Sequence, residues 1–490
     1  MGLLRFSIHP PERLTEALAS RAYLSGLDRI SWQVRASVEE GLLVLQRTAS
    51  DSANLQLPWP VEGRGPVTLA TGSLIERDEP YRLPLELARG AVCQFRNQLA
   101  DWQAIGLAVT PAIHDHAARA CELLGRAAVT QSDAAASAAA AEEAIRAALE
   151  GGDLLTAAYV DQAVHTRRRT GRGAPVLGAD LGGALLDEVV SRQFLAAFNA
   201  AVVPFPWRDI QAVEGPFQWT VPDAQLEWCR ACGLKVCGGP LALLDPAGLP
   251  DWLYLWEGDL ENIAAFAGEF VRQTVERCRG KVHAWLCAGR VNTGAVLGLS
   301  EEDRLRLTAH LIELVHSLDP TTPVLASFDQ PWAECLARRP MDVPPLHYVD
   351  ALVRAELNLA GVVLEMNVGY EPGGTLPRTI FEFSRHLDVW SSFGLPLWIS
   401  VSAPGGSGPD PRAARSNALP DDCWTPKAQQ AWAARYVPLM LAKPYVQGVF
   451  WNTLLDAGPH DFPHAGLFDA AGLPKPALKT LAAARQAFAK

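Results

Sequence analysis

The chain lacks a run of about 20 apolar residues, the length that a membrane-spanning helix needs. Its first residues, MGLLRFSIHPPERL, contain no apolar core of a secretory signal, and Phe6 stands where a myristoylation signal needs serine or threonine. Basic residues are outnumbered, with 43 Lys and Arg against 54 Asp and Glu, and they form no basic stripe. We therefore expect a cytoplasmic protein that binds neither membranes nor nucleic acids.

Metal-binding and disulfide patterns are also missing. The nine cysteines are scattered through segments that look helical or extended, which does not suggest a disulfide framework. Cys229 and Cys232 are separated by two residues, but no second such pair and no paired histidines stand at zinc spacing. We expect Cys229, Cys232 and Cys237 to be buried structural thiols, and the protein to lie in a reducing compartment with no metal and no cofactor.

What is present falls into three compositional blocks, and 490 residues suffice for two or three domains. Residues 1–82 hold short alternating runs broken by proline and glycine, which predicts a small β-domain. Residues 83–173 include an alanine-rich helical pattern that predicts a helical linker segment. Trp32 and Trp59 permit a carbohydrate-binding accessory module in the β-domain, but we expect core packing to be the role of each of them.

The third block, residues 174–490, alternates apolar, β-rich runs with amphipathic helical stretches. Apolar strands joined by helices predict a parallel sheet, and eight such units predict an α/β fold, the (β/α)8 TIM barrel. A doubly wound open sheet is the alternative, but GADLGG after the first run is not a phosphate-binding glycine loop. The eight runs are 176–180, 200–205, 234–238, 282–288, 324–329, 362–367, 397–402 and 448–453.

The residues that end these strands predict the functional site, because barrel enzymes build their active sites at the carboxyl ends of the strands. These ends are rich in aromatic, carboxylate and amide side chains, which suits a carbohydrate: aromatic faces stack on sugar rings, and polar groups bind hydroxyls. The alternative is that each aromatic residue only caps the barrel core. The predicted substrate-binding residues are Asp180, Trp207, Arg290, Asn292, Gln330, Trp332, Asn367, Tyr370, Trp451, Asn452 and Asp456.

Asp329 and Glu365 are the predicted catalytic pair. They end neighbouring strands, and two carboxyl groups about 5–10 Å apart can cleave a glycosidic bond as acid plus nucleophile or base. Their proximity would also separate their pKa values, so that one group stays protonated. The alternative is that either carboxylate forms a structural ion pair with Arg290 or Arg378.

Several segments carry a resemblance to a known family. They are EGPFQWTVPD between the second and third strands, GVFWNTLLDAG at the last strand, and GLFD followed by PKPA near the C-terminus. On these motifs, residues from about 175 to 490 resemble family 10 glycoside hydrolases, which are barrels of clan A that act mainly on xylan. The resemblance implies a barrel fold and a saccharide ligand.

The catalytic residues of that family do not carry over to this chain. Arg290 stands where the family's fourth strand ends in its catalytic glutamate, and ISVS at the end of the seventh strand contains no carboxylate. Two hypotheses follow: a glycoside hydrolase with a relocated site at Asp329 and Glu365, or a catalytically inactive barrel that binds a saccharide or serves as a scaffold. A weaker third hypothesis is metal-dependent hydrolysis with Asp180, Asp329, Glu365 and His460 as ligands, although strand one lacks the H-x-H motif.

Residues 403–425 form a long loop after the seventh strand, rich in glycine, proline, aspartate and arginine. Loops of this length are usually functional or disordered. Because the loop carries Arg412, Arg415 and Trp424, it is a candidate wall of the site.

Overall fold

The computed structural model describes residues 2–48, 50–171, 173–339, 341–415 and 423–489. Residues 416–422 of the predicted wall loop therefore lie outside the described residues. The chain forms two compact units. The first comprises residues 1–170, 332–340 and 376–388, and the second comprises residues 171–331, 341–375 and 389–490.

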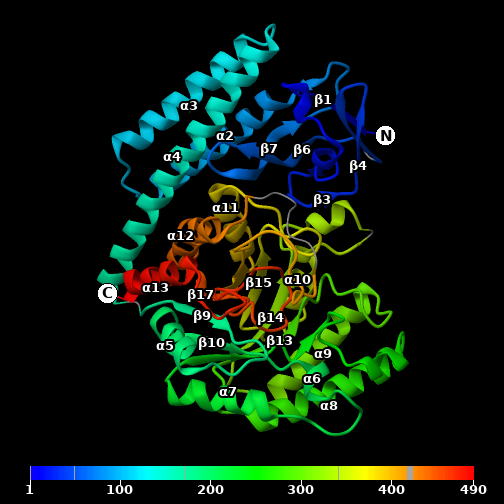
Figure 1. The fold of residues 1–490 in the computed structure, drawn as a ribbon. Coiled ribbons are helices and arrows are strands. Elements are labelled where there is room, and N and C mark those ends of the chain that lie inside the picture. The colour runs from blue at the N-terminus through cyan, green and yellow to red at the C-terminus, as the bar shows by residue number, and fades with distance from the viewer. Residues whose placement is uncertain (1, 49, 172, 340, 416–422, 490) are drawn as a thin grey trace. The chain divides into compact units, whose positions relative to one another are not determined.

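The first unit contains two small sheets, as predicted for the N-terminal region (Figure 1). One sheet has the order β4-β5-β1-β8 and the other has the order β3-β2-β6-β7. The strands are β1 (Gly2–Ser7), β2 (Tyr23–Ser25), β3 (Ser31–Trp32), β4 (Arg35–Glu39), β5 (Leu42–Arg47), β6 (Ala53–Val61), β7 (Gly65–Leu74) and β8 (Tyr81–Arg82).

Helices complete this unit, and α3 and α4 run side by side (Figure 1). A Cβ added at Gly90 of α2 would lie 1.8 Å from the carbonyl oxygen of Ala70, so glycine is what lets α2 approach β7 closely. The helical elements are η1 (Pro11–Arg13), α1 (Glu16–Ala19), α2 (Leu83–Ala104), α3 (Pro111–Val129), α4 (Ala134–Arg169), η3 (Glu334–Ala337) and most of α11 (Ile380–Ser391).

Trp59 is fully buried in this unit, and its indole nitrogen donates to Glu142 Oε1 at 2.9 Å. The guanidinium of Arg13 lies over its ring, 5.2 Å from the centroid. The core-packing alternative is therefore confirmed for Trp59, because no face of this ring is available to a sugar. Trp32 is partly exposed and lies under Arg47.

The second unit is a closed barrel of eight parallel strands, so the predicted fold is confirmed and the open-sheet alternative is wrong. The strand order is β11-β10-β9-β17-β16-β15-β14-β13, and the pairing of β11 with β13 closes the circle. The first, fifth and seventh strands match their predicted bounds residue for residue. The barrel strands are β9 (Val176–Asp180), β10 (Ala200–Val203), β11 (Lys235–Gly238), β13 (Ala284–Gly289), β14 (Val324–Asp329), β15 (Gly361–Asn367), β16 (Leu397–Ser402) and β17 (Val446–Trp451), with a short β12 (Ala242–Leu243) beside β13.

Helices follow the strands and form the outer layer of the barrel. Local signals fix their starts: Ser300 and Asp303, for example, make a capping box at the start of α9. None of the described helices is long and apolar enough to cross a membrane. The nine cysteines all lie among the described residues, and none of them forms a disulfide. The helical elements are α5 (Glu188–Ala197), α6 (Trp207–Ile210), α7 (Thr220–Ala231), η2 (Asp251–Trp256), α8 (Leu260–Cys278), α9 (Glu301–Leu318), α10 (Pro345–Arg354), α12 (Pro426–Ala442) and α13 (Pro476–Ala489).

The barrel interior is a packed apolar core rather than a channel, as is usual for this fold. Every strand contributes to it, since Trp398 of β16 packs against the buried residues supplied by the other seven strands. The polar residues at the carboxyl ends of the strands therefore lie at the end of a solid core, which holds their backbones in place. The buried members are Val176, Ala200, Val202, Cys237, Ala284, Leu286, Leu325, Val363 and Phe450.

Candidate functional site

Arg290, directly after β13, lies at the centre of the polar groups at the strand ends. Its backbone adopts a φ of 55°, a conformation uncommon for a residue other than glycine. Its guanidinium reaches three carboxylates. Nε and Nη2 donate to Glu365 Oε1 at 3.1 and 2.7 Å, Nη1 donates to Asp245 Oδ2 at 3.0 Å, and Nη2 also donates to Asp461. Arg290 is only 4% exposed, so its guanidinium is largely shielded from solvent.

Arg415 adds a second cation to this group. Its Nη2 donates to Asp245 Oδ2 at 2.6 Å, so one carboxylate oxygen joins two guanidiniums. We call Arg290, Arg415, Asp245, Glu365 and Asp461 the arginine–carboxylate cluster. Burial alone would lower the pKa of Arg290, but Asp461 and Glu365 more than offset this and raise it well above its usual value. For Asp461, burial would raise the pKa, but the charge of Arg290 holds it below the usual range.

Glu365 receives further donors from its own strand and from the residue that follows β17. Asn367 Nδ2 donates to Glu365 Oε1 at 3.0 Å. Asn452 Nδ2 lies 3.5 Å from the same oxygen and donates to Asn367 Oδ1 at 3.0 Å, and Ser402 Oγ also donates to Asn367 Oδ1, at 2.6 Å. The carboxylate of Glu365 is thus held by an arginine on one side and amides on the other. Of the two arginines proposed as partners, Arg290 is the one that pairs with Glu365.

Asp329 lies opposite Glu365 in the register of β14 and β15, so the predicted adjacency of the two residues is confirmed. Asn292 pairs with the backbone of Asp329: its Nδ2 donates to the carbonyl oxygen at 2.7 Å, and its Oδ1 accepts from the backbone N–H at 3.0 Å. The carboxyl oxygens accept from Gln330 N at 2.9 Å, Gln330 Nε2 at 3.2 Å and Thr293 Oγ1 at 3.2 Å. Burial, followed by the charge of Glu365, raises the pKa of Asp329 to about 7. The side chain is 2% exposed, so a ligand has little access to it.

Asp180, at the end of β9, is a partly exposed carboxyl of the site. Its Oδ1 accepts from Gly182 N at 2.7 Å. Its surroundings raise its pKa to about 7, mainly through burial and then through the charges of Asp461 and Glu365. The arginine–carboxylate cluster contains three carboxylates and only two arginines. The negative charges of Asp461 and Glu365 therefore help to raise the pKa of Asp180.

The four predicted aromatic ligand residues are all buried, so the stacking role predicted for them has no exposed ring face. Trp207 donates to Gln211 Oε1 at 2.8 Å and stacks on Phe270 of α8. Trp332 belongs to the first unit, where it stacks on His386. Hydrogen bonds to backbone carbonyls hold the other two, from Tyr370 to Pro463 and from Trp451 to Ala465. Their arrangement agrees with the alternative that such residues cap the core.

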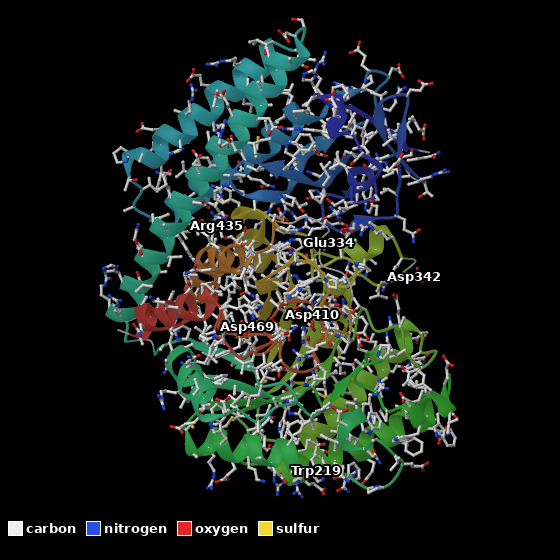
Figure 2. The ribbon with its side chains drawn as sticks, viewed as in Figure 1. Trp219, Glu334, Asp342, Asp410, Arg435 and Asp469 are labelled. Atoms are coloured by element: carbon white, nitrogen blue, oxygen red, sulfur yellow. The ribbon has the colours of Figure 1, made fainter. Side chains whose placement is uncertain are left out.

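Asp456, predicted to bind substrate, lies beside a cavity of about 720 Å³ rather than in the arginine–carboxylate cluster. Asp410 and Asp469, labelled in Figure 2, line the same cavity. Asp456 Oδ2 is 2.6 Å from Lys475 Nζ, and its Oδ1 accepts from Gly466 N at 2.6 Å. This part of the protein is formed by the segments that follow β16 and β17.

Sequence reasoning missed Asp245 and Asp461. Neither residue ends a barrel strand: Asp245 follows the two-residue β12, and Asp461 lies several residues beyond the end of β17. Arg415 was placed in the wall loop, and this loop does supply a side chain to the site. The sequence offered one indication of these two carboxylates: a buried Arg290 would need more than one negatively charged partner.

No family model and no curated protein matches this chain. Two of the solved structures that do match are xylanases. Xylanase 10B from Thermotoga petrophila RKU-1, in complex with xylobiose, is 16% identical, with a TM-score of 0.50 over 66% of this chain and 98% of that chain. Native xylanase 10B from Thermotoga maritima is 15% identical, with a TM-score of 0.50 over 67% of this chain and 97% of that chain. The resemblance to family 10 glycoside hydrolases is thus confirmed for the fold.

Proposed function

We propose that the barrel binds a saccharide at the carboxyl ends of its strands without hydrolysing it through Asp329 and Glu365. The observation that carries this proposal is the paired contact of Arg290 with Glu365. A nucleophile needs a free carboxylate oxygen, and an acid needs a transferable proton. Glu365 Oε1 accepts from Arg290 and Asn367, and Oε2 lies 3.3 Å from Arg290 Nε. Breaking a buried pair of this kind is costly, so Glu365 positions its neighbours instead.

Hydrogen bonds rather than ring stacking would recognise the saccharide. Partly exposed side chains at the strand ends and in the adjoining loops offer both donors and acceptors, as sugar hydroxyls require. The barrel fold of the Thermotoga petrophila xylanase, whose structure contains xylobiose, supports the choice of ligand class. The partly exposed residues are Asp180, Thr293, Arg415, Asn452 and Asp461.

The test measures binding and cleavage on the same samples. Xylo-, cello- and manno-oligosaccharides are titrated into the full chain by calorimetry, and released reducing ends are then assayed. We expect binding without release. Asn452→Ala should weaken binding about tenfold, the worth of a hydrogen bond of about 1.4 kcal/mol. Gln273→Ala, which removes an exposed amide on α8, is the matched control and should leave binding unchanged.

Release of reducing ends by the wild-type chain that disappears in Glu365→Gln would overturn this proposal and favour the relocated hydrolase. Absence of binding across the panel would overturn the saccharide assignment itself, leaving the scaffold alternative.

A second candidate function, hydrolysis with Asp180 as the acid, rests on one specific observation. Asp180 is partly exposed and its pKa is raised to about 7, which suits a group that donates a proton near neutral pH. Asp461, whose charge contributes to that shift, would be the second carboxylate. In this case Asp180→Asn abolishes the release of reducing ends while oligosaccharide binding persists, and Glu365→Gln does not reproduce the loss.

A further inference from the structure

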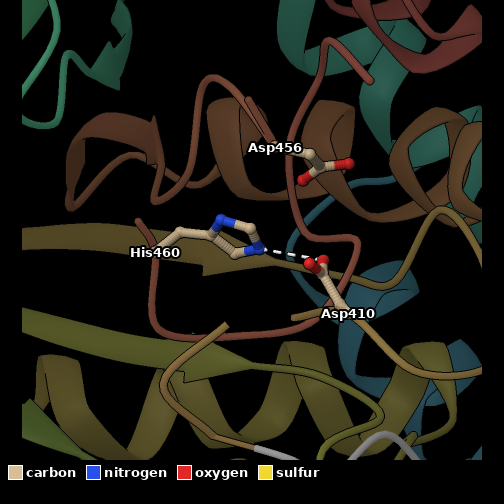
Figure 3. A group of neighbouring side chains, drawn as sticks. All are labelled: Asp410, Asp456 and His460. Carbon is tan, nitrogen blue, oxygen red and sulfur yellow. Dashed lines mark hydrogen bonds and ion pairs between the residues drawn. The ribbon is translucent and has the colours of Figure 1, made fainter. Parts of the chain in front are cut away.

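We propose that Asp410, Asp456 and His460 bind a divalent transition-metal ion of the Zn²⁺ or Mn²⁺ type. The site lies between the loops that follow β16 and β17 (Figure 3), and none of its three residues belongs to the arginine–carboxylate cluster. One nitrogen and two carboxylate oxygens of these residues lie within 4.8 Å of one another. Metal–ligand bonds to zinc are about 2.0–2.2 Å long, so a small inward shift of one carboxylate would bring all three ligands to coordination distance.

The orientation of His460 points to a cation between the imidazole and Asp410. Nδ1 lies 2.8 Å from the carbonyl oxygen of Gly458, which can only accept, so Nδ1 carries the hydrogen. In the neutral ring, Nε2 then presents a lone pair to Asp410 Oδ2 at 3.0 Å. Two acceptors at this distance repel unless a positive charge lies between them. Metal-binding histidines commonly have this arrangement, with the other ring nitrogen donating to a carbonyl.

Asp456 already has a cation in this structure, because Lys475 Nζ lies 2.6 Å from its Oδ2. A second location for this ammonium is close by. Gln429 is fully buried, and its Oε1 has no hydrogen-bond partner among the described residues, whereas its Nε2 is fixed by the carbonyl of Ala403 at 2.8 Å. A Cβ added at Gly405 would meet Lys475 Nζ at 2.8 Å and Gln429 Oε1 at 2.9 Å, so both atoms border one small space.

This arrangement explains how a metal could enter a site whose charges are already balanced. When the ion binds Asp456, the ammonium of Lys475 turns to Gln429 Oε1, which satisfies a buried acceptor that is otherwise unpaired. Asp410, Asp456 and Lys475 all line the cavity of about 720 Å³, which gives the ion a route to its ligands. The bound metal would join the loop after β16 to the loop after β17.

The experiment uses the full chain, stripped with a chelator and titrated with ZnCl2 or MnCl2 by calorimetry. We expect one site for at least one of the two ions, and a higher melting temperature when it is filled. His460→Ala and Asp410→Asn should each weaken binding more than about tenfold, since even the loss of a residue that only supports a metal ligand costs 10–100-fold. His347→Ala removes an exposed histidine on α10 and is the matched control.

Lys475→Gln separates this proposal from adventitious binding at surface histidines. Because the ammonium competes with the metal, its removal should tighten binding, and weaker binding would overturn the proposal. Failure of both ions to bind would mean that a proton on Nε2 alone joins His460 to Asp410. Unchanged binding in the folded His460→Ala or Asp410→Asn variant would place the metal elsewhere. Circular dichroism checks the fold, and either of these two variants suffices if the other fails to fold.

Discussion

Replacing Arg290 with methionine tests whether the arginine–carboxylate cluster is a structural unit. Methionine keeps much of the apolar volume of the arginine stem but removes the guanidinium. Glu365 and Asp461 would then lose their bonds to Arg290, while Asp245 would keep Arg415. Removing one partner of a buried ion pair costs about 3–5 kcal/mol. Because Arg290 is 4% exposed and serves three carboxylates, we expect a loss of unfolding free energy at the upper end of this range.

Urea unfolding at pH 7.5 and pH 5.5, followed by circular dichroism, measures this loss. The matched control is Arg208→Met, which breaks an exposed ion pair with Asp251 whose side chains are 45% and 80% accessible. Such pairs contribute about 0–1 kcal/mol. The cost of Arg290→Met should shrink at pH 5.5, because protonation removes the unpaired negative charges. Adding Glu365→Gln to Arg290→Met should recover part of the stability, since a neutral amide needs no cation.

Two results would refute this reasoning. One is a loss for Arg290→Met no larger than that for the Arg208→Met control. The other is a loss that is the same at both pH values, which would mean that lost packing rather than uncompensated charge causes it.

Three further predictions concern other parts of the molecule. Because the pKa of Asp180 and Asp329 is about 7 in the folded chain and near 3.8 when unperturbed, the folded state holds more protons between these values. The contribution of these two groups should lower the urea midpoint as the pH is raised from 5 to 7, and the decrease should be smaller in Asp180→Asn. A contribution from these groups that raised the midpoint over this pH range would contradict the assignment. Gly90→Ala should lower the free energy of unfolding, measured in urea, by at least about 1–3 kcal/mol, as is typical of overpacking, because the added methyl would meet the carbonyl of Ala70. The control Gly125→Ala adds a methyl in open space and should leave the free energy of unfolding unchanged or raise it. Trp59→Phe should cost about 1–3 kcal/mol by the same assay, because it leaves Glu142 without its indole donor, and an unchanged midpoint would show that this bond contributes nothing.

The barrel could be predicted from the sequence because its signal is local. Each strand is a short apolar run and each helix has its own amphipathic period, so the order of elements gives the order of neighbours around the barrel. The same logic placed Asp329 beside Glu365, since consecutive parallel strands pair and both residues end their strands. The cost of burying an isolated Glu also pointed to a partner, and Arg290 was one of the two that were considered.

Tertiary structure decides which charged side chains of the site are paired and which aromatic rings are covered. Arg290 meets Glu365 across 75 residues and Asp461 across 171 residues, and no local pattern fixes such contacts. The same holds for the aromatic residues: sequence places Trp207 and Tyr370 near strand ends, but the packing of loops and helices decides that their faces are covered. Sequence periodicity specifies which residues end the strands. Which of those side chains remain open to a ligand depends on distant loops that supply counter-charges and cover the rings, and only the folded chain brings those loops together.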